Sequence, residues 1–243
     1  MNLQKTLFVA AALASSGLAQ AQLTTSNWNN GSNLGNALSV SGNSSNVATA
    51  TFDTPFSGEQ LFISATFTVA AGSVLSNNDF LSLWLDNGVS NADHTNVPNF
   101  GIKSDLAGGN DLFVRTTGTA GRALAGSNIT NAASSGNYSF TLVGLLAKTA
   151  GSSTYNSFSA WLNPGTVLGA AAATFVGNSG LASISRIGLR SANLDAGDSV
   201  SVSGLLFGSS FAQVSPVPEP STYAMLLAGL GLLGFMVRRR TGA

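Results

Sequence analysis

The fold is decided by the stretch Gln60–Val69, which reads QLFISATFTV. Apolar residues occupy its odd positions, Leu61, Ile63, Ala65, Phe67 and Val69, and from Ser64 on small polar residues occupy the even ones, Ser64, Thr66 and Thr68. Successive side chains of a strand point to opposite faces. A period of two therefore predicts a strand with one face in a core and the other outside.

Runs of the same kind recur along the chain. They are Phe80–Leu85, Asn99–Ser104, Asp111–Thr116, Tyr138–Lys148, Phe158–Leu162, Ile184–Leu189 and Ser199–Phe207. Between them lie turn clusters such as Asp86-Asn87-Gly88, Gly108-Gly109-Asn110 and Asn163-Pro164-Gly165. Many short strands separated by Gly and Asn turns predict an all-β protein, built as an antiparallel β-sandwich.

Composition narrows the class of protein. The 243 residues include ten basic and ten acidic side chains and no cysteine. Between residues 22 and 215 the basic residues form no cluster, so nucleic acid is not an expected partner. This stretch is long enough for one domain, whose core must form by packing alone because no disulfide is available.

The N-terminus has the layout of a secretory signal peptide. Lys5 supplies a positive charge, Thr6–Leu18 is mostly apolar, and Ala19 and Ala21 form a small-x-small cleavage site. Residues 1–21 are therefore expected to be removed on export, which leaves Gln22 as the mature N-terminus.

The C-terminus, residues 216–243, has three parts in order. The motif Val217-Pro218-Glu219-Pro220 precedes an uncharged segment, Tyr223–Val237, and the cluster Arg238-Arg239-Arg240 follows it. This tail resembles the PEP-CTERM sorting signal of Gram-negative envelope proteins. The resemblance implies an exosortase-type processing enzyme as partner, and such systems are associated with exopolysaccharide-producing bacteria.

The physical chemistry of the tail agrees with that role. A helix over residues 221–237 is near the lower limit of about 17 residues for crossing a bilayer. The arginines place the C-terminus in the cytoplasm, so the inner membrane would tether a body that faces the periplasm before sorting to the surface. Pro218 and Pro220 favour an extended strip at 217–220, which suits recognition by an enzyme.

The body itself resembles the laminin-G-like, concanavalin A-like jelly roll over roughly residues 50–210. The segments that carry the resemblance are Tyr138–Lys148, Ser157–Pro164 with its Ala-Trp-Leu-Asn-Pro, Arg186–Leu189 and Val200–Phe207. In that family a strand ends in a Trp-x-Asn-Pro-like turn and the last strand closes the front sheet.

The sequence does not favour an enzyme. Glycosidases on this fold use a Glu-x-Asp-x-Glu strand, whereas Glu59 is the one glutamate between residues 22 and 215. Asp79 and Asp86 stand at strand-end and turn positions, where solvated or turn-capping roles are expected. His94, the single histidine, lies in a polar loop and is interpreted as solvated.

A metal site is not assigned. Asx residues that could offer oxygen ligands to a structural calcium ion occur at Asn77-Asn78-Asp79, Asp86-Asn87, Asp93 and Asn110-Asp111. None of them has EF-hand spacing, and hairpin turns favour such residues in any case.

Saccharide binding is the alternative function. If Leu81, Leu83 and Leu85 face the core, Trp84 faces outward, and a similar argument places Tyr155 and Trp161 together on a less apolar face. These three rings would form a stacking platform for sugars. The competing interpretation is that they pack in the core. The sequence thus leaves a non-catalytic envelope or matrix protein as the first hypothesis and a lectin-like module as the second.

Overall fold

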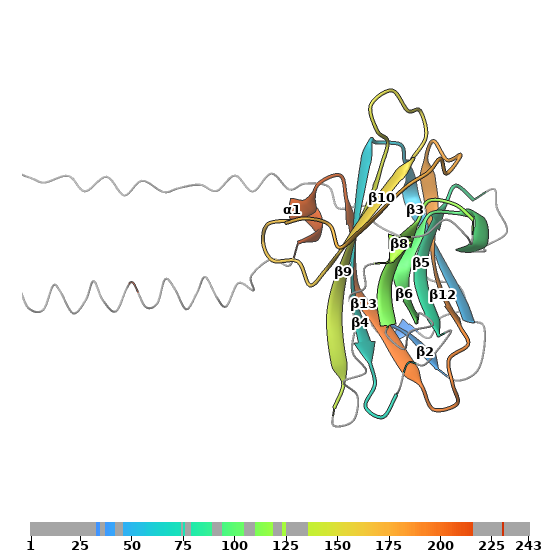
Figure 1. Ribbon diagram of the computed structural model, residues 1–243, viewed down its shortest axis with the longest axis vertical. Helices are drawn as coiled ribbons and strands as arrows, with labels where there is room; N and C mark the ends of the chain where they lie inside the picture. Colours follow the sequence, from blue (N-terminus) through green and yellow to red (C-terminus); the bar gives the residue numbers. More distant parts are fainter. Residues whose placement is uncertain are drawn as a thin grey trace, which may run out of the picture.

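The computed structural model describes residues 33–34, 37–41, 46–73, 75, 79–88, 94–104, 110–118, 123–124, 136–215 and 230. Within these residues, thirteen strands form two antiparallel sheets that pack face to face (Figure 1). One 3-10 turn, η1 (His94–Asn96), and one short helix, α1 (Phe211–Val214), complete this part of the chain.

The seven-stranded sheet contains both the first and the last strand of the described chain. Its order is β1 (Asn33–Leu34), β2 (Ala37–Ser41), β13 (Ser199–Gly208), β4 (Gln60–Val69), β9 (Tyr138–Ala147), β10 (Ser157–Leu162) and β11 (Ala173–Val176). The six-stranded sheet has the order β3 (Asn46–Phe56), β12 (Ile184–Ala192), β5 (Phe80–Asp86), β6 (Asn99–Ser104), β7 (Asn110–Arg115) and β8 (Ala123–Leu124).

The core lies between the sheets and follows the alternation of β4. Its inward residues Leu61, Ile63, Ala65, Phe67 and Val69 are all buried. The ring of Phe67 stacks on that of Phe140 in the neighbouring β9, with centroids 5.6 Å apart. Phe100 of β6 meets Phe158 of β10 at 5.3 Å, which links the two sheets through their aromatic side chains.

A bulge in β13 explains why its sequence pattern changes halfway. Val200 and Val202 face the core, and Phe207 also does so although it lies an odd number of residues further on. The register with β4 shifts between Ser203 and Leu206, and Gly204 takes a positive φ of 59°. An extra residue at this point returns the strand to phase.

The predicted antiparallel sandwich is confirmed, and the predicted runs coincide with strands to within a few residues. Strands β1, β2, β3, β8 and β11 were not predicted. The expected signal peptide, residues 1–21, lies outside the described residues, and so does the expected membrane segment, residues 221–237, apart from Leu230. Among the residues that are described, no helix has the length and apolar character needed to cross a membrane.

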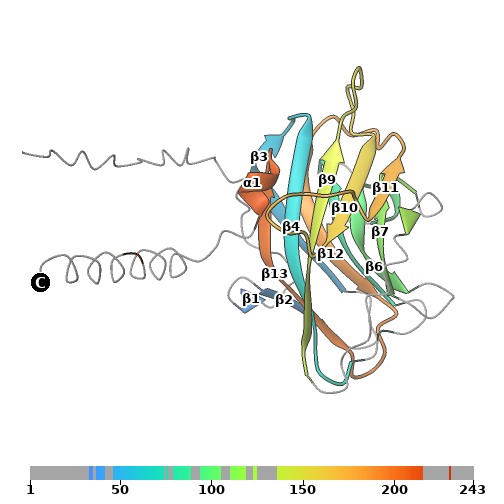
Figure 2. The same cartoon turned by 60° about the vertical axis from the view of Figure 1, so that its left-hand side comes forward.

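Helix α1 packs on the outside of the seven-stranded sheet (Figures 1 and 2). Val214 is buried together with Phe62 of β4 and Val143 of β9, and Phe211 packs beside them. Ser210 and Gln213 form a capping box that begins the helix, and Ser215 ends it in an extended conformation. Helix α1 thus fixes the end of the folded chain to the seven-stranded sheet, directly before the C-terminal tail.

Candidate functional site

The outward-pointing face of the six-stranded sheet carries four of the five Lys and Arg residues that the structure describes. We call it the arginine face and define it by Ser82, Trp84 and Asp86 of β5 with Arg186, Gly188 and Arg190 of β12. The register pairs Ser82 with Arg190, Trp84 with Gly188 and Asp86 with Arg186, so the side chains of each pair lie on the same side of the sheet.

Trp84 lies flat against this face. A Cβ atom added to Gly188 would stand only 1.9 Å from Cε2 and Cζ2 of the indole, so the ring covers the glycine backbone directly. The guanidinium carbon of Arg186 lies 5.5 Å from the centre of the ring. Trp84 is therefore held between a glycine, which makes room for it, and a cation that packs over its π-face.

An ion pair fixes that cation. The Nε of Arg186 donates to Oδ1 of Asp86 at 2.9 Å, and its Nη2 donates to Oδ2 of the same carboxylate. Asp86 also accepts a bond from the backbone N–H of Gly88 at 2.8 Å, which confirms the predicted turn-capping role. A solvated role for Asp86 is wrong, because its side chain is completely buried. The hydrogen bond to Asp86 raises the pKa of the Arg186 guanidinium.

Further cations lie on the same sheet face. Asn99 pairs with Arg115 and Phe80 with Lys103 in the register of β6. Arg115 packs over the ring of Phe113 at 5.0 Å, and Phe113 stacks on Phe80 at 5.4 Å. Of the Lys and Arg residues that the structure describes, only Lys148 lies away from this face of the sheet. The outer face therefore concentrates positive charge that the sequence spreads over 88 positions, from Lys103 to Arg190.

The predicted platform of Trp84, Tyr155 and Trp161 is not formed. Trp84 and Tyr155 are both 0% exposed. Trp84 belongs to β5, which lies between β12 and β6 and is buried on both sides of its sheet, so facing away from the core does not expose it. Trp161 is half-buried on the outside of the other sheet. The rings lie on different sides of the sandwich and offer no common surface to a sugar.

Tyr155 is instead a core residue that links β10 to the turn between β3 and β4. It precedes β10, and its hydroxyl donates to the carbonyl of Gly58, in the turn between β3 and β4, at 2.8 Å. Lys148 lies over its ring at 4.8 Å and donates to the carbonyl of Ser57. Burial raises the pKa of the Tyr155 phenol well above its usual value.

Trp161 belongs to the apolar patch under α1. It packs with Leu168, Leu206 and Phe211, and its indole Nε1 donates to the carbonyl of Gly169 at 2.9 Å. Its polar atom is thus bonded within the chain. This patch is a small second core rather than a ligand surface.

The described structure does not bring the candidate catalytic and metal-binding residues together in one site. Glu59 is exposed, and for His94 the structure gives only its backbone place in η1. Within the described ranges, no group of three or more His, Cys, Asp or Glu side chains is placed to hold a metal ion. Of the Asx residues considered as oxygen ligands, those at 77, 78, 93, 110 and 111 have no described side chains.

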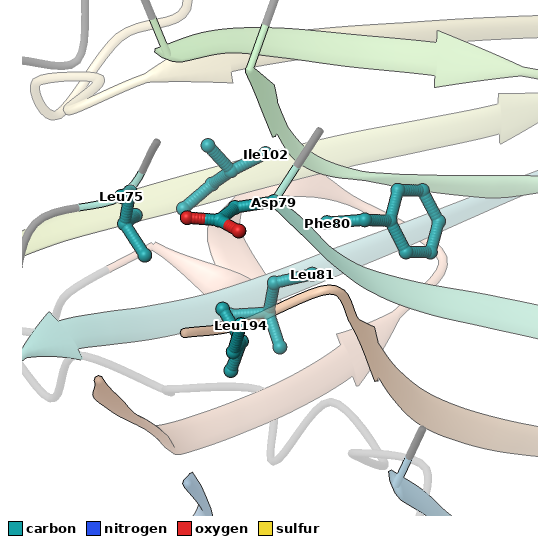
Figure 3. Close-up of a pocket in the computed structure, with 6 residues that line it drawn as sticks. All are labelled: Leu75, Asp79, Phe80, Leu81, Ile102 and Leu194. Carbon is teal, nitrogen blue, oxygen red and sulfur yellow. The ribbon is translucent and has the colours of Figure 1, made fainter. Parts of the chain in front are cut away.

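A small pocket lies at one end of β5 (Figure 3). Leu75, Phe80, Leu81, Ile102 and Leu194 line it together with Asp79, and its cavity volume is about 10 Å³, at the lower limit for a single water molecule. In Figure 3 the Asp79 carboxylate projects between the side chains of Leu75, Ile102 and Leu194. Contrary to the expectation of a solvated aspartate, Asp79 is buried. The walls of the pocket are almost entirely apolar, unlike those of a site for a polar ligand.

The arginine face was missed by reading the sequence, although a signal exists. In Arg186-Ile-Gly-Leu-Arg190, Arg, Gly and Arg alternate with Ile and Leu. A period of two places both arginines on one face and marks the glycine between them as a place where another side chain approaches the backbone. The partner Trp84 lies 104 positions earlier, so the sequence pattern alone does not supply it.

Comparison with solved structures finds sandwiches of a similar kind. Lectin I-B4 from Griffonia simplicifolia, in its metal-free form, aligns with a TM-score of 0.49 and 10% identity over 82% of this chain and 96% of that chain. The legume lectin-like domain from Entamoeba histolytica gives 0.45 and 8%, over 72% and 84%. The globular domain of T. cruzi calreticulin gives 0.43 and 10%, over 70% and 71%. No curated protein matches the sequence.

The tail gives the specific match. Residues 216–240 match the PEP-CTERM protein-sorting motif, and they include Val217–Pro220 and Arg238–Arg240 as predicted from the sequence. The motif begins one residue after Ser215, which caps α1. It implies an exported, surface-sorted protein that an exosortase processes. The chain is a two-sheet β-sandwich that ends in a PEP-CTERM protein-sorting motif.

Proposed function

We propose that this protein is a non-catalytic component of the cell envelope or of the extracellular matrix, displayed outside the cell after its tail is processed. The observation that carries the proposal is the sorting motif at residues 216–240, directly behind a folded sandwich. The inner membrane holds residues 221–237 until an exosortase-type enzyme acts at Val217–Pro220.

The end of the sandwich supports this order of events. Val214 is buried on the seven-stranded sheet, and Ser215 is extended. Proline at 218 and 220 favours an extended conformation at the residue before each proline and removes two N–H donors, so we expect this strip to be poorly suited to join a strand or a helix. The folded body thus protects the chain up to residue 214 and leaves the motif to the processing enzyme.

The chemistry of the body supports a non-catalytic role. A retaining glycosidase requires two carboxylates about 5 Å apart. The single glutamate of the body, Glu59, is exposed, and the carboxylate of Asp86 is committed to Arg186 and to the turn at Gly88. The sandwich is better suited to display and binding than to acid–base chemistry.

The test compares the fate of the tail in the native host. The native chain is expected to lose Arg238–Arg240 and to end near residues 217–221, as measured by intact mass after cell fractionation. A triple variant, Pro218→Ala with Glu219→Ala and Pro220→Ala, should stay full-length in the inner membrane. Pro164→Ala, between the exposed residues Asn163 and Gly165 of the body, is the matched control and should be processed normally. Native protein that keeps its arginines in the inner membrane would refute the proposal.

Saccharide binding is a second candidate role. It is favoured by one observation, the buried polar groups without partners on the arginine face, and not by the three rings that the sequence suggested. The two roles are compatible, because display outside the cell would bring the body into contact with extracellular saccharides.

A further inference from the structure

Three polar atoms of the arginine face are buried without a hydrogen-bond partner in the described structure. They are Oγ of Ser82, Nε1 of Trp84 and Nε of Arg190. Ser82 stands opposite Arg190 across the β5–β12 ladder, and Trp84 stands on the next outward position of β5, opposite Gly188. The three atoms therefore belong to adjacent places on one side of two paired strands.

Leaving such groups unpaired is costly. A buried donor without a partner loses about 1–3 kcal/mol, and more when it is charged. Ser82 and Trp84 are 0% exposed, so bulk water does not solvate their polar atoms. Three losses of this size on neighbouring positions indicate that a bound group satisfies them in the working protein.

The three residues also specify the chemistry of that group. An indole N–H and a guanidinium only donate hydrogen bonds, and a hydroxyl can donate as well. A partner for all three must therefore be an acceptor. Arg190 is half-buried and forms no ion pair with another of the described residues, so the acceptor that suits it best is an anion.

The surroundings favour a planar oxyanion. Arg186 stands two residues from Gly188 on the same face, held by Asp86 over the ring of Trp84. Its field adds to that of Arg190, although Asp86 neutralises part of it. A guanidinium fork matches the two oxygens of a carboxylate and binds them in a bidentate manner.

We propose that the arginine face binds a carboxylate of an acidic saccharide, with Arg190 as the charged contact and Ser82 and Trp84 as neutral donors beneath it. The carboxylate follows from the unpaired donors, whereas the saccharide rests on the proposed function, which places this face among extracellular polymers. Arg190 is the half-exposed member of the three. Because the three polar atoms themselves have almost no accessible surface, its side chain swings outward to admit the carboxylate.

The test is calorimetric titration of the full chain in detergent with oligomers of glucuronate and of galacturonate. Methyl-esterified oligomers of the same length are the matched ligand, because they keep the sugar and lose the charge. Binding of the acids at least tenfold tighter than the esters is expected. Failure of both acids to bind, or equal binding of the esters, overturns the proposal.

Variants locate the site. Arg190→Gln should weaken binding by roughly 10- to 100-fold, as expected for a hydrogen bond to a charged group. Arg190→Lys should restore part of the affinity, because it keeps the charge without the fork. Lys148→Gln removes the same charge away from this face and should change affinity by less than about twofold. Equal losses in Arg190→Gln and Lys148→Gln would show a diffuse charge effect and overturn the site.

A readout on the native chain covers the case in which Arg190→Gln fails to fold. The indole N–H resonance of Trp84, identified through Trp84→Phe, should move downfield when the acid is added. An unmoved resonance at saturating acid means that ordered water satisfies these donors, which overturns the proposal. The titration is independent of tail processing in cells, so failure of the binding site and failure of the sorting role are separately visible.

Discussion

The two outward faces of the sandwich are built on the same alternation but differ in what they carry. On the seven-stranded sheet, small hydroxyl side chains pair across strands. We call this the threonine face and define it by Thr66 with Thr141, whose oxygens are 3.2 Å apart, and Thr68 with Ser139, at 2.7 Å. On the arginine face, an aromatic ring, an ion pair and an unpaired guanidinium are all partly or fully buried.

Outward side chains on two equally regular sheets can thus contribute very differently to the free energy of unfolding. The hydroxyl pairs on the threonine face are exposed or only partly buried, so each contributes little to stability. On the arginine face the side chains are largely removed from water. A polar group there that loses its partner therefore costs its full desolvation free energy. Substitutions on the two faces should therefore differ strongly in effect.

The largest effect is expected at the ion pair. Asp86→Ala removes the carboxylate that holds the Arg186 guanidinium over Trp84 and also removes the acceptor for the Gly88 N–H. The free energy of unfolding in urea should fall by about 3 kcal/mol, as for the loss of one partner of a buried pair. Asp86→Asn keeps an acceptor for Gly88 and should lose less. A loss below about 1 kcal/mol would mean that Arg186 is effectively solvated.

A smaller loss is expected where Trp84 contacts the sheet. Gly188→Ala places a Cβ 1.9 Å from the indole and forces the ring away, which should cost about 2 kcal/mol and change the tryptophan fluorescence. Gly144→Ala in β9 is the matched substitution on the other sheet, where the nearest atom, of Phe158, is 3.0 Å away. Urea unfolding should show the smaller change for Gly144→Ala, and equal changes would contradict the close approach at Gly188.

Tyr155, between the two faces, tests one interior hydrogen bond. Tyr155→Phe removes the bond to Gly58 and should lower the free energy of unfolding by about 1 kcal/mol at pH 7. Because burial raises the pKa of the folded-state phenol, its contribution is complete below the unfolded pKa of about 10 and falls as pH rises above it. The native chain should thus lose stability above pH 10 more steeply than Tyr155→Phe. Parallel curves would place the phenol in water.

The smallest effect is expected on the threonine face. Thr68→Ala removes an exposed hydroxyl pair with Ser139 and should change the free energy of unfolding by no more than about 0.5 kcal/mol. Urea unfolding at high precision measures this. A loss comparable to that of Asp86→Ala would erase the contrast between the two faces.

The sequence determined the strands because their pattern is local. The alternation at 60–69 gave β4 with its bounds and its inward residues, since a strand's facing depends only on neighbours two positions apart. The sorting motif was also predicted from the sequence, because it is a contiguous linear segment. Strand β3 was missed because its buried positions include Ala50, which is too small to give a clear apolar alternation.

Only the tertiary structure decided what covers each outward face. The alternation correctly set Trp84 apart from Leu83 and Leu85, but whether an outward ring meets water depends on strand order and on distant residues. Asp86 and Arg186 are 100 positions apart and become neighbours because β5 pairs with β12. Burial, ion pairing and the unpaired donors of the arginine face arise from such long-range pairing, which a pattern of adjacent residues does not encode.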